Sequence, residues 1–434
     1  MILKQQKITD KISLSYINTD KFKIETLSFS FIYKKTKQSF AYDKFLSRIF
    51  NRGTEKYPSI SAIDKALTTL YGAFAEVRTP GAGNCASLML NVEFLNNKYA
   101  LDGTDILGGV IDVAEQILFH PLFKTESFDP NIFEHEKKLI LEDLDAQKSN
   151  TRSYAITRCI ELFYESEEFP TSEEISEMVK SATLSDIIDF YNSIISNSQL
   201  NVFYVGSEDA STVSSLIETA FAKYSCIGSE KLTASVKNRT PSENSKFGTE
   251  KMEVNQGKIA MCFDTRTWIS RDNDDYYAAL VLNEIFGGSV SSKLFLNVRE
   301  DMGLCYHCSS SFSVYTGIIT VSSGFKVEMF DVLKQAVMQQ LEEIKQGNIS
   351  DCEISNAKKL LSNSYKQLND APLALHSFYS GRDLFDVSDT IDDSIEKIQA
   401  VSTEQIIEIA NKTSLESVFF VEGTLTQNGE QEDE

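Results

Sequence analysis

The chain has 434 residues, of which 42% are hydrophobic, so it is long enough to form two or three domains with buried cores. Its 63 acidic residues outnumber its 42 lysines and arginines, and the formal net charge of −21 argues against nucleic acid or an anionic membrane as a partner. No segment approaches the roughly 20 apolar residues that span a bilayer, and no signal peptide is recognisable at the start. We therefore expect a globular, cytoplasmic protein.

The first half of the chain is predicted to begin with a strand and to continue with helices and further strands. Alternating apolar residues indicate strands, and apolar residues at helical spacing indicate helices. The expected strands lie at 22–33, 74–79, 86–94 and 200–205, and the expected helices at 39–51, 61–71, 106–119 and 130–147, followed by a run of helices to residue 196.

The second half repeats the pattern with strands first and long helices afterwards. Strands are expected at 258–264 and from 306 through 324, and helices at 274–286, 331–345 and 350–368, with one more helix ending near Arg299. Strands followed by runs of helices in each half indicate an α+β fold rather than a doubly wound one.

Two similar segments indicate that the domain is duplicated. Helices capped by Thr183 and Ser402, each with an acid or amide three residues later, lead into V-F-Y-V-G at 202–206 and V-F-F-V-E-G at 418–423. The two caps lie close to half the chain length apart. We therefore predict an N-terminal domain at 1–227, a polar linker at 228–256, a C-terminal domain at 257–424 and a disordered tail at 425–434.

In the second half, the run at 295–306 has polar residues whose spacing indicates a functional site. Gly303 is a natural stop after the helix that ends with Arg299, and Tyr306 opens the next strand. A guanidinium and a phenol on either side of one tight turn can both donate hydrogen bonds to a peptide carbonyl or a developing oxyanion. The alternative from these residues alone is a helix-end arginine and a half-buried tyrosine that only pack.

A duplicated α+β domain with F-x-x-x-R-E-x-x-G-L-x-Y in its second copy resembles the pitrilysin/insulinase metallopeptidase family. The likeness is to its half-size, two-domain subunits, which pair into a clam-shaped peptidase with mostly antiparallel sheets and helices packed on them. It spans nearly the whole chain, and the positions that fit the pattern are Phe295, Arg299, Glu300, Gly303, Leu304 and Tyr306. The resemblance implies that Arg299 and Tyr306 bind substrate near the scissile bond.

The resemblance also locates a zinc motif, H-x-x-E-H, shortly before Gly53, and this chain has lost it. The ligand and base positions hold Lys44, Ser47 and Arg48, none of which can take the role of a histidine ligand or a glutamate base. The family's third ligand position holds Asp143, seven residues after Glu136, and one carboxylate does not make a metal site. We expect no zinc on this chain, and we expect Lys44 or Arg48 to pair with Asp143 or Glu136.

Cys305, His307 and Cys308 form a second group that deserves comparison with known chemistry. No second pair of cysteines completes a four-ligand zinc site, and a redox pair would sit at a helix N-terminus rather than in a β-prone run. The other histidines, His120, His135 and His376, form no pair at helical spacing and are interpreted as structural or surface residues.

Three functional hypotheses remain open. The first is a non-catalytic subunit of a heterodimeric zinc peptidase, which supplies Arg299 and Tyr306 to a zinc site on a homologous partner with an intact motif and acts on an extended peptide. The second is a catalytically silent binding or scaffold protein of the same fold. The third is a hydrolase using Cys305, His307 and Cys308. The isolated chain is a possible homodimer. The resemblance implies that an unfolded peptide would add as a strand to a sheet edge near residues 73–79.

Overall fold

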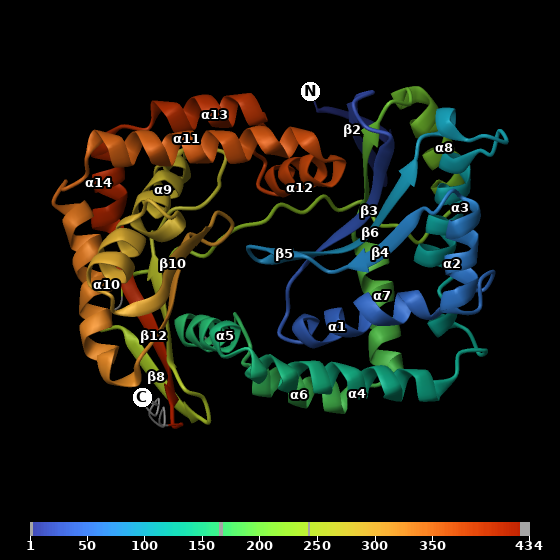
Figure 1. Cartoon of the computed structure of the whole chain (residues 1–434). Helices are drawn as coiled ribbons and strands as arrows, with labels where there is room; N and C mark the ends of the chain where they lie inside the picture. Colours follow the sequence, from blue (N-terminus) through green and yellow to red (C-terminus); the bar gives the residue numbers. More distant parts are fainter. Residues whose placement is uncertain (1–2, 165–167, 242–243, 426–434) are drawn as a thin grey trace, which may run out of the picture. The chain divides into compact units, whose positions relative to one another are not determined.

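The computed structural model describes residues 3–164, 168–241 and 244–425, and it divides the chain into two compact units. Unit 1 comprises residues 1–143, 172–235 and 366–390, and unit 2 comprises residues 144–171, 236–365 and 391–434. Each unit is built around one mixed, mostly antiparallel sheet with helices packed on it, which confirms the expected α+β class (Figure 1).

The sheet of unit 1 has the order β1-β2-β7-β3-β6-β4, with β5 paired to β6. All its pairs are antiparallel except β2 with β7. β3 lies in the middle and is buried along most of its length, as its apolar sequence requires. The strands are β1 (Lys4–Thr9), β2 (Ile12–Asn18), β3 (Ile24–Lys34), β4 (Phe74–Arg78), β5 (Gly81–Ala82), β6 (Cys85–Leu95) and β7 (Leu200–Gly206).

The helices of unit 1 pack their apolar stripes on this sheet and on one another. α1 shows the pattern: Phe45, Leu46 and Ile49 are fully buried, while the residues between them are only half-buried. The helices are α1 (Ser39–Ile49), α2 (Ile60–Thr69), α3 (Ile106–Phe119), α4 (Pro130–Ala146), α6 (Ser172–Ser181), α7 (Leu184–Asn197), α8 (Ala210–Phe221) and α12 (Pro372–Asp383).

The sheet of unit 2 has the order β10-β11-β9-β12-β8, and only β12 with β8 is parallel. Its strands are β8 (Lys246–Met252), β9 (Gly257–Asp264), β10 (Cys305–Ser313), β11 (Ile318–Phe325) and β12 (Ser414–Gly423). Its helices are α5 (Thr151–Phe163), α9 (Asp275–Asn283), α10 (Phe330–Lys345), α11 (Asp351–Gln367), α13 (Ile391–Ala400) and α14 (Thr403–Lys412), with π-helical turns at Glu284–Gly288 and Leu294–Asp301.

The two sheets share one topology, as expected for a duplication. Taken in chain order, β2, β3, β4, β6 and β7 occupy the same places in unit 1 as β8 to β12 occupy in unit 2. The two helices that precede β7 and β12 also begin alike, because Thr183 with Asp186 and Ser402 with Gln405 both form complete capping boxes. By this topology, the edge strands β4 and β10 are equivalents.

Each sheet is covered in part by a helix that comes from the other half of the sequence. α5 follows α4 in the chain but packs on β9 and β12, where Ala155, Cys159 and Phe163 join one core with Ala260 and Phe419. α12 follows α11 but packs on β3 and β7 of unit 1. Sequence periodicity predicts that these helices exist, but it does not say which sheet they cover.

Two expectations about local structure need correction, and a third is not tested. β1 and β2 precede the first strand that the sequence analysis predicted, because Ile12, Leu14 and Ile17 are buried by pairing with β7 rather than left in an irregular start. Within the segment expected to be a linker, β8 forms a parallel edge strand. Its polar composition suits an edge, where one face is solvated. The predicted tail lies outside the described residues apart from Leu425.

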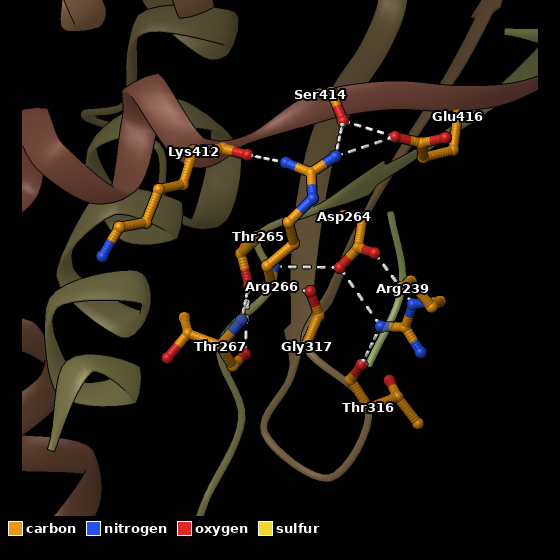
Figure 2. A network of polar contacts seen from close by, with 10 residues as sticks. All are labelled: Arg239, Asp264, Thr265, Arg266, Thr267, Thr316, Gly317, Lys412, Ser414 and Glu416. Atoms are coloured by element: carbon orange, nitrogen blue, oxygen red, sulfur yellow. Dashed lines mark hydrogen bonds and ion pairs between the residues drawn. The ribbon is translucent and has the colours of Figure 1, made fainter. Parts of the chain in front are cut away.

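The part of the expected linker that enters unit 2 is fixed by a polar network (Figure 2). Arg239 donates from Nε and Nη2 to the two carboxylate oxygens of Asp264, at 2.8 and 3.1 Å, and from Nη2 to the carbonyl oxygen of Thr316, at 2.6 Å. Beside it, Arg266 pairs with Glu416 and donates to the carbonyl oxygen of Lys412. These contacts anchor the chain at the end of β9.

Candidate functional site

The first candidate site lies in unit 1, where α1 presents the positions of the lost zinc motif. Because α1 buries its apolar stripe, Lys44, Ser47 and Arg48 fall on the adjoining face and are half-buried. The Ser47 hydroxyl donates to the carbonyl oxygen of Lys44 at 3.1 Å, within the helix itself. Ser47 is therefore engaged with the backbone and is not placed as a base.

Ion pairs occupy the place where the resemblance would put a metal. Arg48 Nη1 lies 3.4 Å from Glu136 Oε2, and Arg48 Nη2 contacts Asp143 Oδ2. Glu136 is fully buried on α4, whereas the arginine remains partly exposed. The predicted pairing of Arg48 with Glu136 and Asp143 is confirmed.

Arg52 is a further member of this cluster that the sequence analysis missed. It pairs with the second carboxylate oxygen of Glu136, so that two guanidinium groups neutralise one buried carboxylate. Its position four residues after Arg48 was the available signal, since residues at this spacing lie on one helical face. This face continues past the end of α1 into the short helix Phe50–Arg52, and the sequence analysis did not follow it that far.

The charges around Lys44 also oppose a divalent cation. Burial lowers the pKa of the Lys44 ammonium, and Arg48 lowers it further, while Asp43 and Asp143 act in the opposite direction. Asp43 was not predicted as a site residue. It accepts a hydrogen bond from the Tyr33 hydroxyl, and burial raises its pKa to about 7. Within the described part of the chain, no group of three or more histidines, cysteines or acids is placed to hold a metal ion.

The second candidate site lies in unit 2, at the turn between the π-helix Leu294–Asp301 and β10. Arg299 is in the last turn of this helix, Gly303 has a φ of 60°, and Tyr306 is the second residue of the strand. The helix–turn–strand arrangement expected from the sequence is confirmed. The π-helical form was not predicted, and such wide turns often occur at functional sites.

Arg299 and Tyr306 differ in their local contacts and in their exposure. The Arg299 guanidinium lies 4.5 Å from the centre of the Phe295 ring and 3.5 Å from Glu300 Oε1, so it has local partners but remains over a third exposed. Tyr306 is 52% exposed. It is also the extra residue of a β-bulge, since Cys305 pairs with Phe325 and His307 with Gly324. Bulges redirect side chains and frequently lie beside active sites.

The residues around Tyr306 are influenced by Arg299. A hydrogen bond from Cys308 lowers the pKa of the Cys305 thiol to about 7, with a further contribution from Arg299. Burial lowers the pKa of His307 to about 4, and Arg152, Lys258 and Arg299 add to this shift. Both cysteines are free thiols. Arg299 therefore acts electrostatically on both neighbours of Tyr306.

Comparison with known proteins agrees with these observations. The family description "Peptidase M16 inactive domain" matches residues 181–361. The chain is 26% identical over 412 residues, covering 94% of this chain and 95% of the relative, to "Probable inactive metalloprotease YmfF" of Bacillus subtilis. By these matches, the chain is a homologue of the M16 peptidases. It is of the inactive-domain type, which confirms the resemblance seen in the sequence.

Two further matches place this M16 chain among its relatives. It is 29% identical over 183 residues, or 39% of this chain and 42% of the relative, to "Uncharacterized zinc protease YmxG" of the same bacterium. A conserved protein of Enterococcus faecalis has the same fold, with a TM-score of 0.88 and 24% identity over 99% of this chain and all of that one. None of the described helices of this M16 homologue has the length and apolar character needed to cross a membrane.

Proposed function

We propose that this chain is the non-catalytic, substrate-binding subunit of a heterodimeric zinc metallopeptidase that acts on peptides. The observation that supports it most is a contrast between two sites. The zinc-motif positions hold Lys44, Ser47 and Arg48, and Arg48 forms ion pairs with Glu136 and Asp143. By contrast, the Arg299 and Tyr306 motif is intact and leaves Tyr306 exposed. Chemistry has been lost where the metal would bind, and hydrogen-bond donors have been kept where a substrate would bind.

The proposed roles follow from the chemistry of the two side chains. The Arg299 guanidinium donates hydrogen bonds to a substrate carbonyl, and the Tyr306 hydroxyl donates to the oxygen that develops negative charge during attack. The residues of this chain do not fit a zinc ion, because cations stand at the ligand positions. The metal and the water that it activates therefore belong to the partner subunit.

An edge strand offers a place for the peptide in unit 1. β4 is bonded to β6 on one side and ends the strand order on the other. Its first residue, Phe74, is 57% exposed. An extended peptide can add to such an edge through main-chain hydrogen bonds, with side chains alternating between the two faces.

The relatives support a pairing of unlike subunits. Bacillus subtilis contains both a relative named as an inactive metalloprotease and one named as a zinc protease. A homologue of the second kind, with an intact zinc motif, is the partner we propose. Without it, the isolated chain is expected to associate at most with itself.

A scaffold role without peptidase activity in any complex is the second candidate. The contacts of Arg299 with Phe295 and Glu300 favour it, because they would also be present if the motif only packed. A scaffold role gives no reason for Tyr306 to be exposed.

Reconstitution tests the proposal. The chain is mixed with the homologue from its own source that retains H-x-x-E-H, and cleavage of a library of unstructured peptides is followed by mass spectrometry. We expect each subunit alone to be inactive and the mixture to cleave. A zinc-bearing homologue that is fully active alone and gains nothing from this chain would overturn the proposal and leave the scaffold role.

A further inference from the structure

Unit 2 contains a cluster of basic side chains that no acidic group of the described residues balances. His307, Gly324 and Lys258 are direct partners across β10, β11 and β9, so their side-chain positions share one face of the sheet. Two residues along, Ser309 and Ser322 form the next row of the same face. The basic cluster is defined here as Arg152, Lys258 and His307.

Arg152 reaches this face from the first turn of α5. Its Nε donates to Ser322 Oγ and its Nη2 to Ser309 Oγ, both at 3.0 Å. A guanidinium has five N–H donors, so three remain for another acceptor. Arg152 is exposed, and the apolar residues of α5 cover the sheet only farther along, at Ala260 and Cys262.

The side chains of Lys258 and His307 both lie close to Gly324, which has no side chain to separate them. A Cβ at Gly324 would lie 2.6 Å from Lys258 Nζ and 3.0 Å from His307 Cε1. Lys258 donates one hydrogen bond, to Gln256 Oε1 at 2.8 Å, and two of its N–H groups remain. His307 Nε2 is buried without a hydrogen-bond partner among the described residues.

No carboxylate of the described residues pairs with this cluster. Within the described ranges, the side-chain partners of Arg152 are Ser322 and Ser309 and that of Lys258 is Gln256, none of them acidic, although the chain has 63 acidic residues. The pKa of Lys258 is lowered by burial and by Arg152, and the charged groups that act on His307 are all cations. Like charges held together without a counter-ion favour the binding of an anion.

We propose that Arg152, Lys258 and His307 form a binding site for a carboxylate of the peptide substrate. The proposal rests on the peptide-binding function proposed above, because the cluster begins at the residue after Tyr306 on the same edge strand. Guanidinium and ammonium groups form strong charge-assisted hydrogen bonds with carboxylates. The carboxylate is either the C-terminus of the peptide or an acidic side chain, and the test separates these two sources.

Calorimetric titration of the full chain, in chloride buffer at constant ionic strength, tests the site with three matched peptides. The first has neutral side chains and a free C-terminal carboxylate, the second is its C-terminal amide, and the third is the amide with one glutamate. We expect the first or the third to bind at least about tenfold more tightly than the second, the gain of one charged hydrogen bond. Whichever does so identifies the source.

Variants and one spectroscopic signal decide whether the cluster is responsible. Arg152→Gln and Lys258→Gln should remove the preference and leave the amide's affinity unchanged, whereas Lys359→Gln on α11 should have no effect. The pKa of the His307 imidazole, followed by NMR, should rise from about 4 when the carboxylate peptide binds, because the anion offsets the neighbouring cations.

Failure of this inference differs from failure of the proposed function. Equal binding of all three peptides, unchanged in both variants and without a shift of His307, would overturn the carboxylate site and leave peptide binding intact. If no peptide binds but inorganic phosphate raises the His307 pKa through Arg152 and Lys258, the peptide carboxylate is wrong and so is the peptide-binding role.

Discussion

Basic side chains gather in both units, but they meet opposite surroundings. In unit 1, Arg48 and Arg52 face the buried Glu136, and Arg48 also contacts Asp143. In unit 2, Arg152 and Lys258 share a sheet face with serines and a neutral imidazole. The cations of the first cluster are paired with carboxylates of the protein, whereas those of the second have no carboxylate partner among the described residues, as the proposed anion site requires.

The helices exchanged between the halves deepen this comparison. α12 brings His376 onto the sheet of unit 1, where its Nε2 hydrogen-bonds to Ser28 at 2.7 Å and the ring is 3% exposed. α5 brings Arg152 onto the equivalent sheet of unit 2 and leaves it exposed. The two helices therefore differ: α12 places a buried neutral side chain on the sheet of unit 1, and α5 places an exposed charged side chain on the sheet of unit 2.

The largest effect on stability should come from removing the cations of the first cluster. Arg48→Met combined with Arg52→Met leaves the Glu136 carboxylate buried without a partner, and we expect a loss of about 3 kcal/mol in the free energy of unfolding. Denaturant unfolding monitored by circular dichroism measures it.

The control for that prediction adds Glu136→Leu to the two arginine changes. With the buried charge removed as well, most of the stability should return, because apolar replacement of a buried ion pair is often neutral. A loss below about 1 kcal/mol in the double variant would show that this cluster is no more satisfied than an exposed pair.

The next effect concerns turnover and the motif of unit 2. In a complex reconstituted with the zinc-bearing partner, Arg299→Ala or Tyr306→Phe should lower kcat/KM by about 10²–10³, the typical cost of losing one donor to a developing oxyanion. Lys359→Ala, which removes an exposed cation of α11, is the matched control. Full turnover by both variants, with assembly intact, would identify Arg299 and Tyr306 as packing residues.

A smaller effect should appear as acid sensitivity of unit 1. Burial lowers the pKa of His376 to about 4, so between pH 6.5 and 4 the unfolded chain binds a proton that the folded chain does not. Stability from this group is present above pH 6.5 and is lost as the pH falls, with a limiting slope of about 1.4 kcal/mol per pH unit.

His376→Gln isolates this contribution. The variant should unfold with a shallower dependence on pH across the same window, while Ser28→Ala, which keeps the imidazole, should retain the slope. Parallel curves for the wild type and His376→Gln would contradict the buried neutral histidine.

The smallest effect is expected where the basic cluster is dismantled. Arg152→Gln or Lys258→Gln should change the free energy of unfolding by no more than about 0.5 kcal/mol, and in the stabilising direction in the absence of an anion, since each relieves repulsion between like charges. Thermal unfolding in chloride buffer provides the measurement. A loss of more than about 1 kcal/mol would mean that the hydrogen bonds of Arg152 to Ser309 and Ser322, or of Lys258 to Gln256, outweigh the repulsion between the cations.

Much of the fold was predictable because local patterns and tertiary structure agree. The strands of the duplicated sheets, the capping boxes at Thr183 and Ser402, and the turn at Gly303 all follow from spacing and residue type. β1 was missed because Lys4–Thr9 is polar and an edge strand requires only one partner. β2 was missed although Ile12 and Leu14 alternate with serines, which is a strand pattern. The π-helix before Gly303 also has no sequence signal, because its apolar residues satisfy an ordinary helical period.

From the sequence, members of the candidate sites could be predicted only within a single helix or strand. The pairing of Arg48 with Glu136 and Asp143 was predictable once the resemblance brought α1 and α4 together, but Arg52 lies beyond the helix that periodicity defines. The basic cluster was out of reach, because α5 is distant in sequence from β9 and β10. The packing of α5 on the sheet of unit 2 depends on tertiary contacts that no local pattern encodes.

Zinc content tests the central claim, that this chain binds substrate and not metal, most directly. The isolated chain, the zinc-bearing homologue and their complex are dialysed against trace zinc, and metal is counted per chain by mass spectrometry. We predict substoichiometric zinc on this chain, one zinc per heterodimer, and no change when Asp143→Ala is introduced here. One tightly bound zinc on the isolated chain, lost with Asp143→Ala, would contradict the account.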